Sequence, residues 1–167
     1  DELGVLGLNL TGVKDGGCAH RQDLRKLEYL DLWNGKITDE SLRLIGTMEG
    51  LEVLGLEGTA ITDAGLAYLR NLVNMHDINL QSTPVSDDGV RELANMSRLT
   101  GLNVRNTRVT DAIVDFIVDH FGLSHFNLPK QISPEAYARM EGQPRYNPGQ
   151  NRFTITVLDG PTGQPVK

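Results

Sequence analysis

Side chains suited to binding a partner recur at intervals of 24 residues. One such series contains an indole, a carboxylate, an amide and a guanidinium, and two parallel series add further polar side chains. Aromatic and arginine side chains contribute most of the binding energy at protein interfaces, so Trp33 and Arg105 are the strongest candidates. The predicted partner-binding residues are Tyr29, Asp31, Trp33, Glu57, Asp77, Asn79, Gln81, Asn103, Arg105 and His125.

Two of these series have structural alternatives. Trp33 could instead pack on its neighbour in the next unit or cover the irregular first unit. Asn79, Asn103 and Asn127 could form a recognition strip, or a ladder of neutral polar side chains that lets the strands stack closely. The pattern leaves both alternatives open.

Metal chemistry has less support. His20, His76, His120 and His125 share no series, and zinc needs three or four converging ligands. The regularly spaced aspartates could suggest calcium, but each follows a Ser or Thr that can cap a helix, and a helix N-terminus favours a carboxylate by itself. We therefore predict no metal site and no cofactor. The aspartates are Asp39, Asp63, Asp87 and Asp111.

The sequence shows no catalytic constellation. It contains no phosphate-binding G-x-x-x-x-G-K-[ST] motif, no H-E-x-x-H motif and no Ser, His and Asp at matching places. Cys18 aligns with Leu66, which places it in a buried helical series, and His120 aligns with Met96, which predicts a partly buried structural residue. We predict that the chain is not an enzyme.

The elements that position the candidates follow from the same periodicity. Six units repeat without slippage, and the first half of each alternates apolar and variable residues, which is typical of a strand. The alternating apolar residues predict a core, so the variable residues between them should face solvent. The three apolar series are Leu3, Leu27, Leu51, Met75, Leu99, Leu123; Leu6, Leu30, Leu54, Ile78, Leu102, Phe126; and Leu8, Leu32, Leu56, Leu80, Val104, Leu128.

The second half of each unit predicts a short helix. It opens with a hydroxyl residue and an aspartate, and apolar residues then recur three apart, as in Leu66, Leu69 and Leu72. A threonine series between strand and helix, represented by Thr59 and Thr83, is expected to satisfy backbone groups at the turn. No single unit can bury its own apolar side, so the units should stack into a parallel sheet with outer helices.

The unit L-x-x-L-x-L-x-x-T-x-I-T-D-x-G-L-x-x-L resembles the leucine-rich repeats. It is most similar to their 24-residue T-D-x-G-L variety, which is related to F-box-associated repeats, and residues 51–74 match best. Threonine stands at Thr59, Thr83 and Thr107, where the F-box-associated form often has cysteine, so the bacterial variety is the nearer likeness. The resemblance implies an α/β, right-handed solenoid with a parallel inner sheet, and it implies little about function.

The domain organisation follows from where the repeats end. We expect a six-unit solenoid over residues 1–141 and a turn-rich linker over 142–152. The alternating pattern from residue 153 predicts a strand in 153–167, which either caps the solenoid or begins a following immunoglobulin-like module. The chain is expected to be one piece of a longer protein.

Composition narrows the class of partner. The net charge of −6 and pI near 5.1 disfavour nucleic acid, which binds clustered basic faces. No apolar run is long enough to span a membrane. We predict a module that binds a protein on its concave face, with end-to-end self-association through the terminal units as a further expectation. The alternative is a structural spacer or regulatory arm of a larger bacterial surface protein or enzyme.

Overall fold

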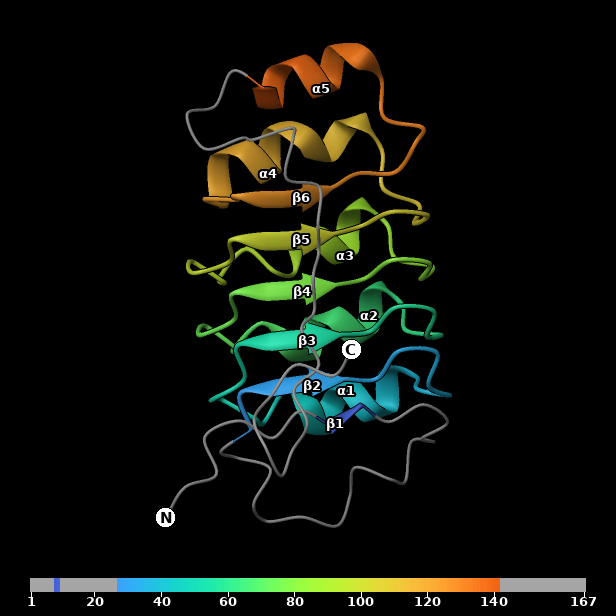
Figure 1. Ribbon diagram of the computed structural model, residues 1–167, viewed down its shortest axis with the longest axis vertical. Coiled ribbons are helices and arrows are strands. Elements are labelled where there is room, and N and C mark those ends of the chain that lie inside the picture. Colours follow the sequence, from blue (N-terminus) through green and yellow to red (C-terminus); the bar gives the residue numbers. More distant parts are fainter. Residues whose placement is uncertain (1–7, 10–26, 142–167) are drawn as a thin grey trace, which may run out of the picture.

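The computed structural model describes residues 8–9 and 27–141, which form a curved stack of similar units (Figure 1). From residue 27 onward, each unit begins with a short strand, which a turn connects to a helix. The expectations for Cys18, for the helix of the first unit and for residues 142–167 lie outside the described residues.

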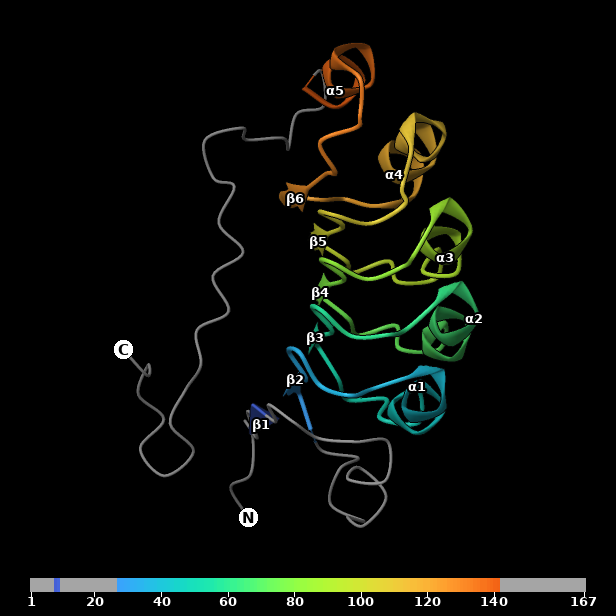
Figure 2. The same cartoon turned by 90° about the vertical axis from the view of Figure 1, so that its right-hand side faces the viewer.

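The strands form one parallel sheet, and their order in the sheet follows their order in the chain. Leu30 pairs with Leu54, which pairs with Ile78, so the 24-residue period corresponds to one step across the sheet. The path from strand to helix and back turns in a right-handed sense (Figures 1 and 2). The strands are β1 (Leu8–Asn9), β2 (Tyr29–Asp31), β3 (Val53–Gly55), β4 (Asp77–Asn79), β5 (Gly101–Asn103) and β6 (His125–Asn127).

The helices cover one face of the sheet, and the stack curves so that the strands line its concave side (Figure 2). Two units combine α-helix with 3₁₀-helix, which suits apolar residues spaced three apart because a 3₁₀ turn contains three residues. The helices are α1 (Asp39–Ile45), α2 (Asp63–Leu66) continued by η3 (Ala67–Leu69), α3 (Asp87–Arg91), η4 (Asp111–Ile113) leading into α4 (Val114–His120), and α5 (Pro134–Glu141).

The predicted apolar series form a continuous core between sheet and helices. In the central units Leu54, Leu56, Ile78 and Leu80 are fully buried, and the helical series that includes Leu69 is buried as well. Burial of this kind is the dominant favourable term in folding. Each unit therefore depends on its neighbours for its core, as predicted from the sequence.

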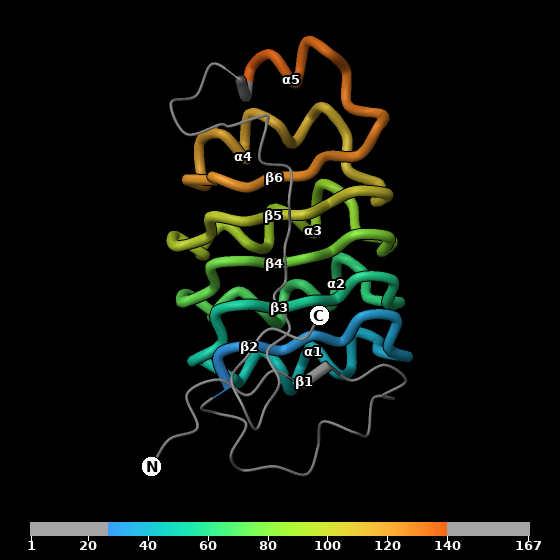
Figure 3. The backbone as a smooth tube through the Cα atoms, in the orientation of Figure 1, coloured from blue at the N-terminus to red at the C-terminus, as the bar shows by residue number. Residues whose placement is uncertain are grey.

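The turns after the strands stack along one edge of the solenoid (Figure 3). Thr59, Thr83 and Thr107 are buried there, and each hydroxyl donates to the backbone carbonyl three residues earlier, at 2.6, 2.7 and 2.6 Å respectively. The predicted role of the threonines is confirmed. In the third unit Gly58 takes a left-handed conformation (φ 69°), which glycine adopts without steric cost.

The repeated aspartates connect neighbouring units. The Asp63 carboxylate accepts from the Ser86 backbone N–H at 2.8 Å and from the Ser86 hydroxyl at 2.7 Å. Asp39 contacts Thr62 in the same way, at 2.7 and 2.6 Å. Each carboxylate therefore fixes the residue at the N-cap position of the next unit's helix. The sequence had predicted only that each aspartate favours the N-terminus of its own helix.

His120 does not occupy the buried position predicted for it. Its side chain is exposed, its Nδ1 lies 2.9 Å from the Phe116 carbonyl oxygen, and its ring stacks on Phe116. The core position is taken by Phe121, which is buried together with Ile117. This unit has a seven-residue α-helix, and 3.6 residues per turn shift the buried side chain one residue beyond the three-residue spacing.

Candidate functional site

The concave strand face carries the predicted binding residues. Trp33 follows β2 and has 44% of its surface exposed, the largest exposed aromatic surface on this side. Arg105 follows β5 and is exposed as well, while Glu57 and Gln81 lie half-buried between them. These four residues stand one strand apart from each other because the sheet is in register.

Asp31, Asn79 and Asn103 are not exposed: their accessible fractions are 7%, 5% and 3%. The expectation that every variable strand residue faces solvent is therefore wrong for this series. Each side-chain oxygen accepts the backbone N–H two residues later; in the case of Asn79 the donor is Gln81, at 3.0 Å. The sequence left open whether the asparagine series forms a recognition strip or a ladder of polar side chains. For Asn79 and Asn103 these contacts agree with the ladder.

The buried polar side chains, which we call the ladder, fix part of the exposed strip. The strip consists of Trp33, Glu57, Gln81 and Arg105. Asn79 Nδ2 donates to one carboxylate oxygen of Glu57 at 3.1 Å, and Gln81 Nε2 donates to the other at 2.9 Å. Asn103 Nδ2 in turn donates to Gln81 Oε1 at 3.1 Å. Glu57 and Gln81 are thus held in place by hydrogen bonds within the protein. Gly55 has no side chain to extend the ladder to Trp33.

Burial changes the ionisation of two groups at the start of the strip. Burial, assisted by the nearby charge of Asp31, raises the pKa of Tyr29 to about 12. Burial also raises the pKa of the Asp31 carboxyl, although the hydrogen bond from the Trp33 N–H opposes the rise. With this pKa the Tyr29 hydroxyl is neutral at neutral pH and can donate a hydrogen bond, and it has no hydrogen-bond partner among the described residues.

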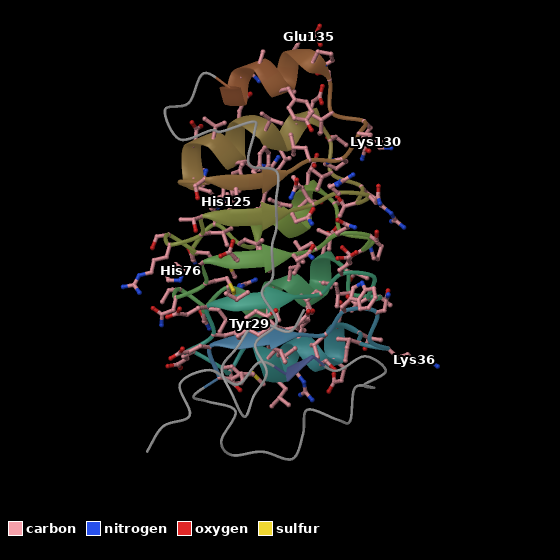
Figure 4. The ribbon with its side chains drawn as sticks, viewed as in Figure 1. Tyr29, Lys36, His76, His125, Lys130 and Glu135 are labelled. Atoms are coloured by element: carbon pink, nitrogen blue, oxygen red, sulfur yellow. The ribbon has the colours of Figure 1, made fainter. Side chains whose placement is uncertain are left out.

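A second group of charges lies further along the face. Gly101 separates Asp77 from His125 in the sheet, and a side chain at Gly101 would overlap the Asp77 carboxylate. Burial raises the pKa of Asp77, while the imidazoles of His125 and His76 oppose the rise. His76 and His125 are labelled in Figure 4 on the side of the sheet where the strands begin.

Ser124 approaches His125 in a way the sequence did not suggest. Its Oγ lies 3.0 Å from His125 Nδ1 and 3.4 Å from the Thr100 carbonyl oxygen. A hydroxyl nucleophile needs a base that a third group orients. Here the base is the next residue in the chain, and the hydroxyl also contacts the backbone of the preceding unit. We therefore interpret the Ser124–His125 contact as a structural one, which helps to hold the start of β6 against the preceding unit, and not as a catalytic pair.

Replacing Asp31 with asparagine should stabilise the protein at neutral pH by about 1 kcal/mol, a usual size for restoring a repeat consensus. The raised pKa of Asp31 means that the group favours folding when protonated and loses that contribution as pH rises through its folded pKa. Asparagine keeps the acceptor for Trp33 and removes the buried charge, so the gain should shrink toward pH 4. Urea denaturation at several pH values measures this.

The exposed Asp88→Asn variant is the control for that prediction, because it changes the net charge equally on a solvated helix turn. We expect its effect to stay within about 0.5 kcal/mol. Equal stability of the Asp31→Asn variant and the wild type at neutral pH would contradict the burial argument.

Three residues near the strip were not selected from the sequence. Arg108 and Lys130 are exposed on the turns of the last two units. Burial raises the pKa of Tyr137 on α5, and the nearby positive charge of Arg105 opposes the rise. Comparing charge at equivalent positions of successive units would have identified the two turn residues. Tyr137 could not be found this way, because α5 follows the last strand outside the regular repeat.

No group of three or more His, Cys, Asp or Glu side chains within 8–9 and 27–141 is arranged to hold a metal ion. Among the helices described, none is long and apolar enough to cross a membrane.

Comparison with known proteins gives structural but not sequence matches. No family model and no curated protein matches the sequence. Internalin C2 of Listeria monocytogenes superposes with a TM-score of 0.52 at 23% identity, over 65% of this chain and 45% of its own. A second internalin of that species gives 0.55 at 18%, over 86% and 47%. A leucine-rich-repeat protein of Leptospira interrogans gives 0.51 at 21%, over 81% and 34%.

The chain thus spans less than half the length of each of these bacterial proteins. At these identities the likeness is one of fold. Together with the parallel sheet, the right-handed path and the outer helices, it shows that the chain has the α/β fold of a leucine-rich-repeat solenoid.

Proposed function

We propose that this solenoid is a non-catalytic module that binds a protein partner on its concave strand face. The observation that carries the proposal is the strip from Trp33 to Arg105, in which exposed anchors flank a hydrogen-bonded pair, Glu57 and Gln81. Large aromatic and arginine side chains at such positions are typical of interface hot spots. The fold itself favours an interaction role over a catalytic one.

The order within the strip supports binding on energetic grounds. Association costs free energy when side chains or loops must be immobilised, at about 0.5–1.5 kcal/mol for each flexible side chain. Glu57 and Gln81 already contact each other and the buried ladder, and the strands beneath them are fixed by the core. A partner docking here meets a surface that is largely in its bound form.

Affinity capture from a lysate of the source organism tests the proposal. The wild-type chain is compared with the double variant Trp33→Ala, Arg105→Ala. We expect a partner that the wild type retains and the variant loses. Two hot spots at about 2 kcal/mol each correspond to a weakening of about 700-fold. A thermal melt confirms that the variant is folded.

A matched control changes an equally exposed aromatic residue and arginine elsewhere. Tyr68 lies on η3, on the helix side, and is 47% exposed, and Arg98 is exposed in a return loop. The variant Tyr68→Ala, Arg98→Ala should capture the partner as the wild type does. If both double variants capture equally, the concave strip is not the binding surface, and a spacer or regulatory arm becomes the better account.

Self-association through the terminal units is a separate proposal. Sedimentation of the purified chain over a range of concentrations measures it directly. A mass that rises with concentration supports end-to-end contact, whereas a constant monomer mass rejects it.

A further inference from the structure

The cations of this acidic protein divide into paired and unpaired groups. Within the described residues, Arg43, Arg70 and Arg139 form ion pairs with Glu40, Glu92 and Asp115. Two more have other partners: Arg98 donates to Asn74 at 3.2 Å, and Arg91 lies over the Phe116 ring. The cations that no ion pair, side-chain hydrogen bond or ring contact joins to another described residue are Lys36, Arg105, Arg108 and Lys130.

Three of those four occur in two adjacent units. Arg105 and Arg108 belong to the fifth unit and Lys130 to the sixth, and all three are exposed. Lys36 belongs to the second unit, at the other end of the stack. Figure 4 shows Lys36 and Lys130 projecting from the same edge of the solenoid, the edge where the strands end.

Contacts between the two turns bring the segments that carry these cations side by side. Gln131 Nε2 donates to the carbonyl oxygens of Thr107 and Val109, both at 3.0 Å. The turn that carries Lys130 therefore lies directly on the turn that carries Arg108. Arg105 sits at the start of the same turn, where Val104 N–H donates to the Asn127 carbonyl at 2.8 Å and joins the two strands.

The patch continues the concave strip. Arg105 belongs to both the patch and the strip. The side-chain amides beside it already have partners, because Asn103 donates to Gln81 and Gln81 donates to Glu57. No acceptor among residues 8–9 and 27–141 is hydrogen-bonded to the Arg105 guanidinium, so within this part of the chain its N–H donors can serve an external acceptor. Glu135, the nearest acidic residue along the chain after Lys130, projects from the end of the stack rather than from this edge (Figure 4).

We propose that Arg105, Arg108 and Lys130 form a site for an acidic segment of the partner protein, which leaves the concave face across the edge of the last two units. This inference rests on the proposed function and adds the chemistry of the partner. Grouped unpaired cations attract carboxylates and raise association rates. A short acidic segment meets only this patch, whereas a long uniform polyanion such as nucleic acid also meets the negative charge of the rest of the protein, whose net charge is −6.

The test measures binding of a fluorescein-labelled peptide of alternating Glu and Gly by anisotropy at low ionic strength. The variant Arg108→Gln, Lys130→Gln is compared with the wild-type chain. Exposed ion pairs contribute about 0.2–1 kcal/mol each, so we expect the peptide affinity to fall about threefold to tenfold. Added salt should weaken wild-type binding, because exposed charges are screened.

The control variant Lys36→Gln, Arg43→Gln changes the net charge by the same amount at the other end of the stack, and it should leave the affinity within about twofold. An equal loss in both variants, or no peptide binding by the wild type, would overturn the proposal. Tighter binding of a single-stranded oligonucleotide than of the peptide would overturn it in favour of a nucleic-acid surface. Neither tested residue belongs to the concave strip, so the capture experiment judges the strip independently.

Discussion

Replacing Leu80 with alanine is expected to lower the free energy of unfolding by about 3 kcal/mol. Leu80 is fully buried in the fourth unit, between the sheet and the helices. Truncation of such a residue loses the transfer free energy of the removed atoms and leaves a cavity, which together cost about 2–5 kcal/mol. Because each unit packs only on its neighbours, the cavity should weaken the coupling between the two halves of the stack.

The repeat supplies the control for this prediction. Val104 occupies the equivalent position one unit later and is fully buried, so Leu80→Val places a side chain the series already accepts. We expect that variant to lose about 1 kcal/mol. Guanidinium denaturation followed by circular dichroism ranks the two. Equal losses would mean that the core around Leu80 relaxes to fill the space, contrary to tight packing between units.

The series of apolar residues was sufficient to predict the fold because each unit repeats the same burial requirement. A single leucine predicts little, but Leu54, Ile78 and Leu102 in phase can be buried together only if the strands pair in register, as they do. The threonine turns were predicted for the same reason. Repetition supplied the evidence that an alignment would otherwise give.

The polar ladder could not be predicted, because the sequence does not reveal how a small polar side chain satisfies its hydrogen bonds. Asn79 alternates correctly for an exposed strand residue, yet it turns toward the backbone of Gln81 and is buried. The short Asn79 side chain can reach a backbone N–H two residues away, and this local hydrogen bond holds it in a buried position. The set of exposed candidate residues is accordingly smaller than predicted.

Contacts between units were also beyond the sequence pattern. Asp63 was expected to favour its own helix N-terminus, and it instead holds Ser86 of the next unit. The juxtaposition of Arg108 and Lys130 likewise depends on a side chain, Gln131, that reaches back across the turn. Residues about one period apart in sequence are neighbours in space, but the periodicity does not specify which side chains meet.

Replacing Gly46 with alanine should destabilise the protein by about 2 kcal/mol, although simple propensity predicts the opposite sign. Gly46 ends α1 with helical dihedral angles (φ −61°, ψ −10°), a conformation in which alanine usually stabilises by about 0.4–1 kcal/mol. A Cβ at Gly46 would, however, lie well inside contact distance of the Tyr68 carbonyl oxygen and 3.0 Å from its carbon. That obstacle is backbone of the next unit, and overpacking of this kind costs about 1–3 kcal/mol.

Ala94, two units later at the equivalent place in the repeat, shows that the position itself accepts a Cβ, so the requirement for glycine comes from the close approach of Tyr68 alone. Ala94 lies in the turn after α3, so Ala94→Gly should cost no more than about 0.5–1 kcal/mol, the difference between the two residues inside a helix. Urea denaturation measures the free energy of unfolding of both variants, and the sign of the change for Gly46→Ala tests the argument. If Gly46→Ala proves more stable than the wild type, α1 and η3 are packed more loosely than the structure shows, and the tight stacking inferred for the second and third units is wrong.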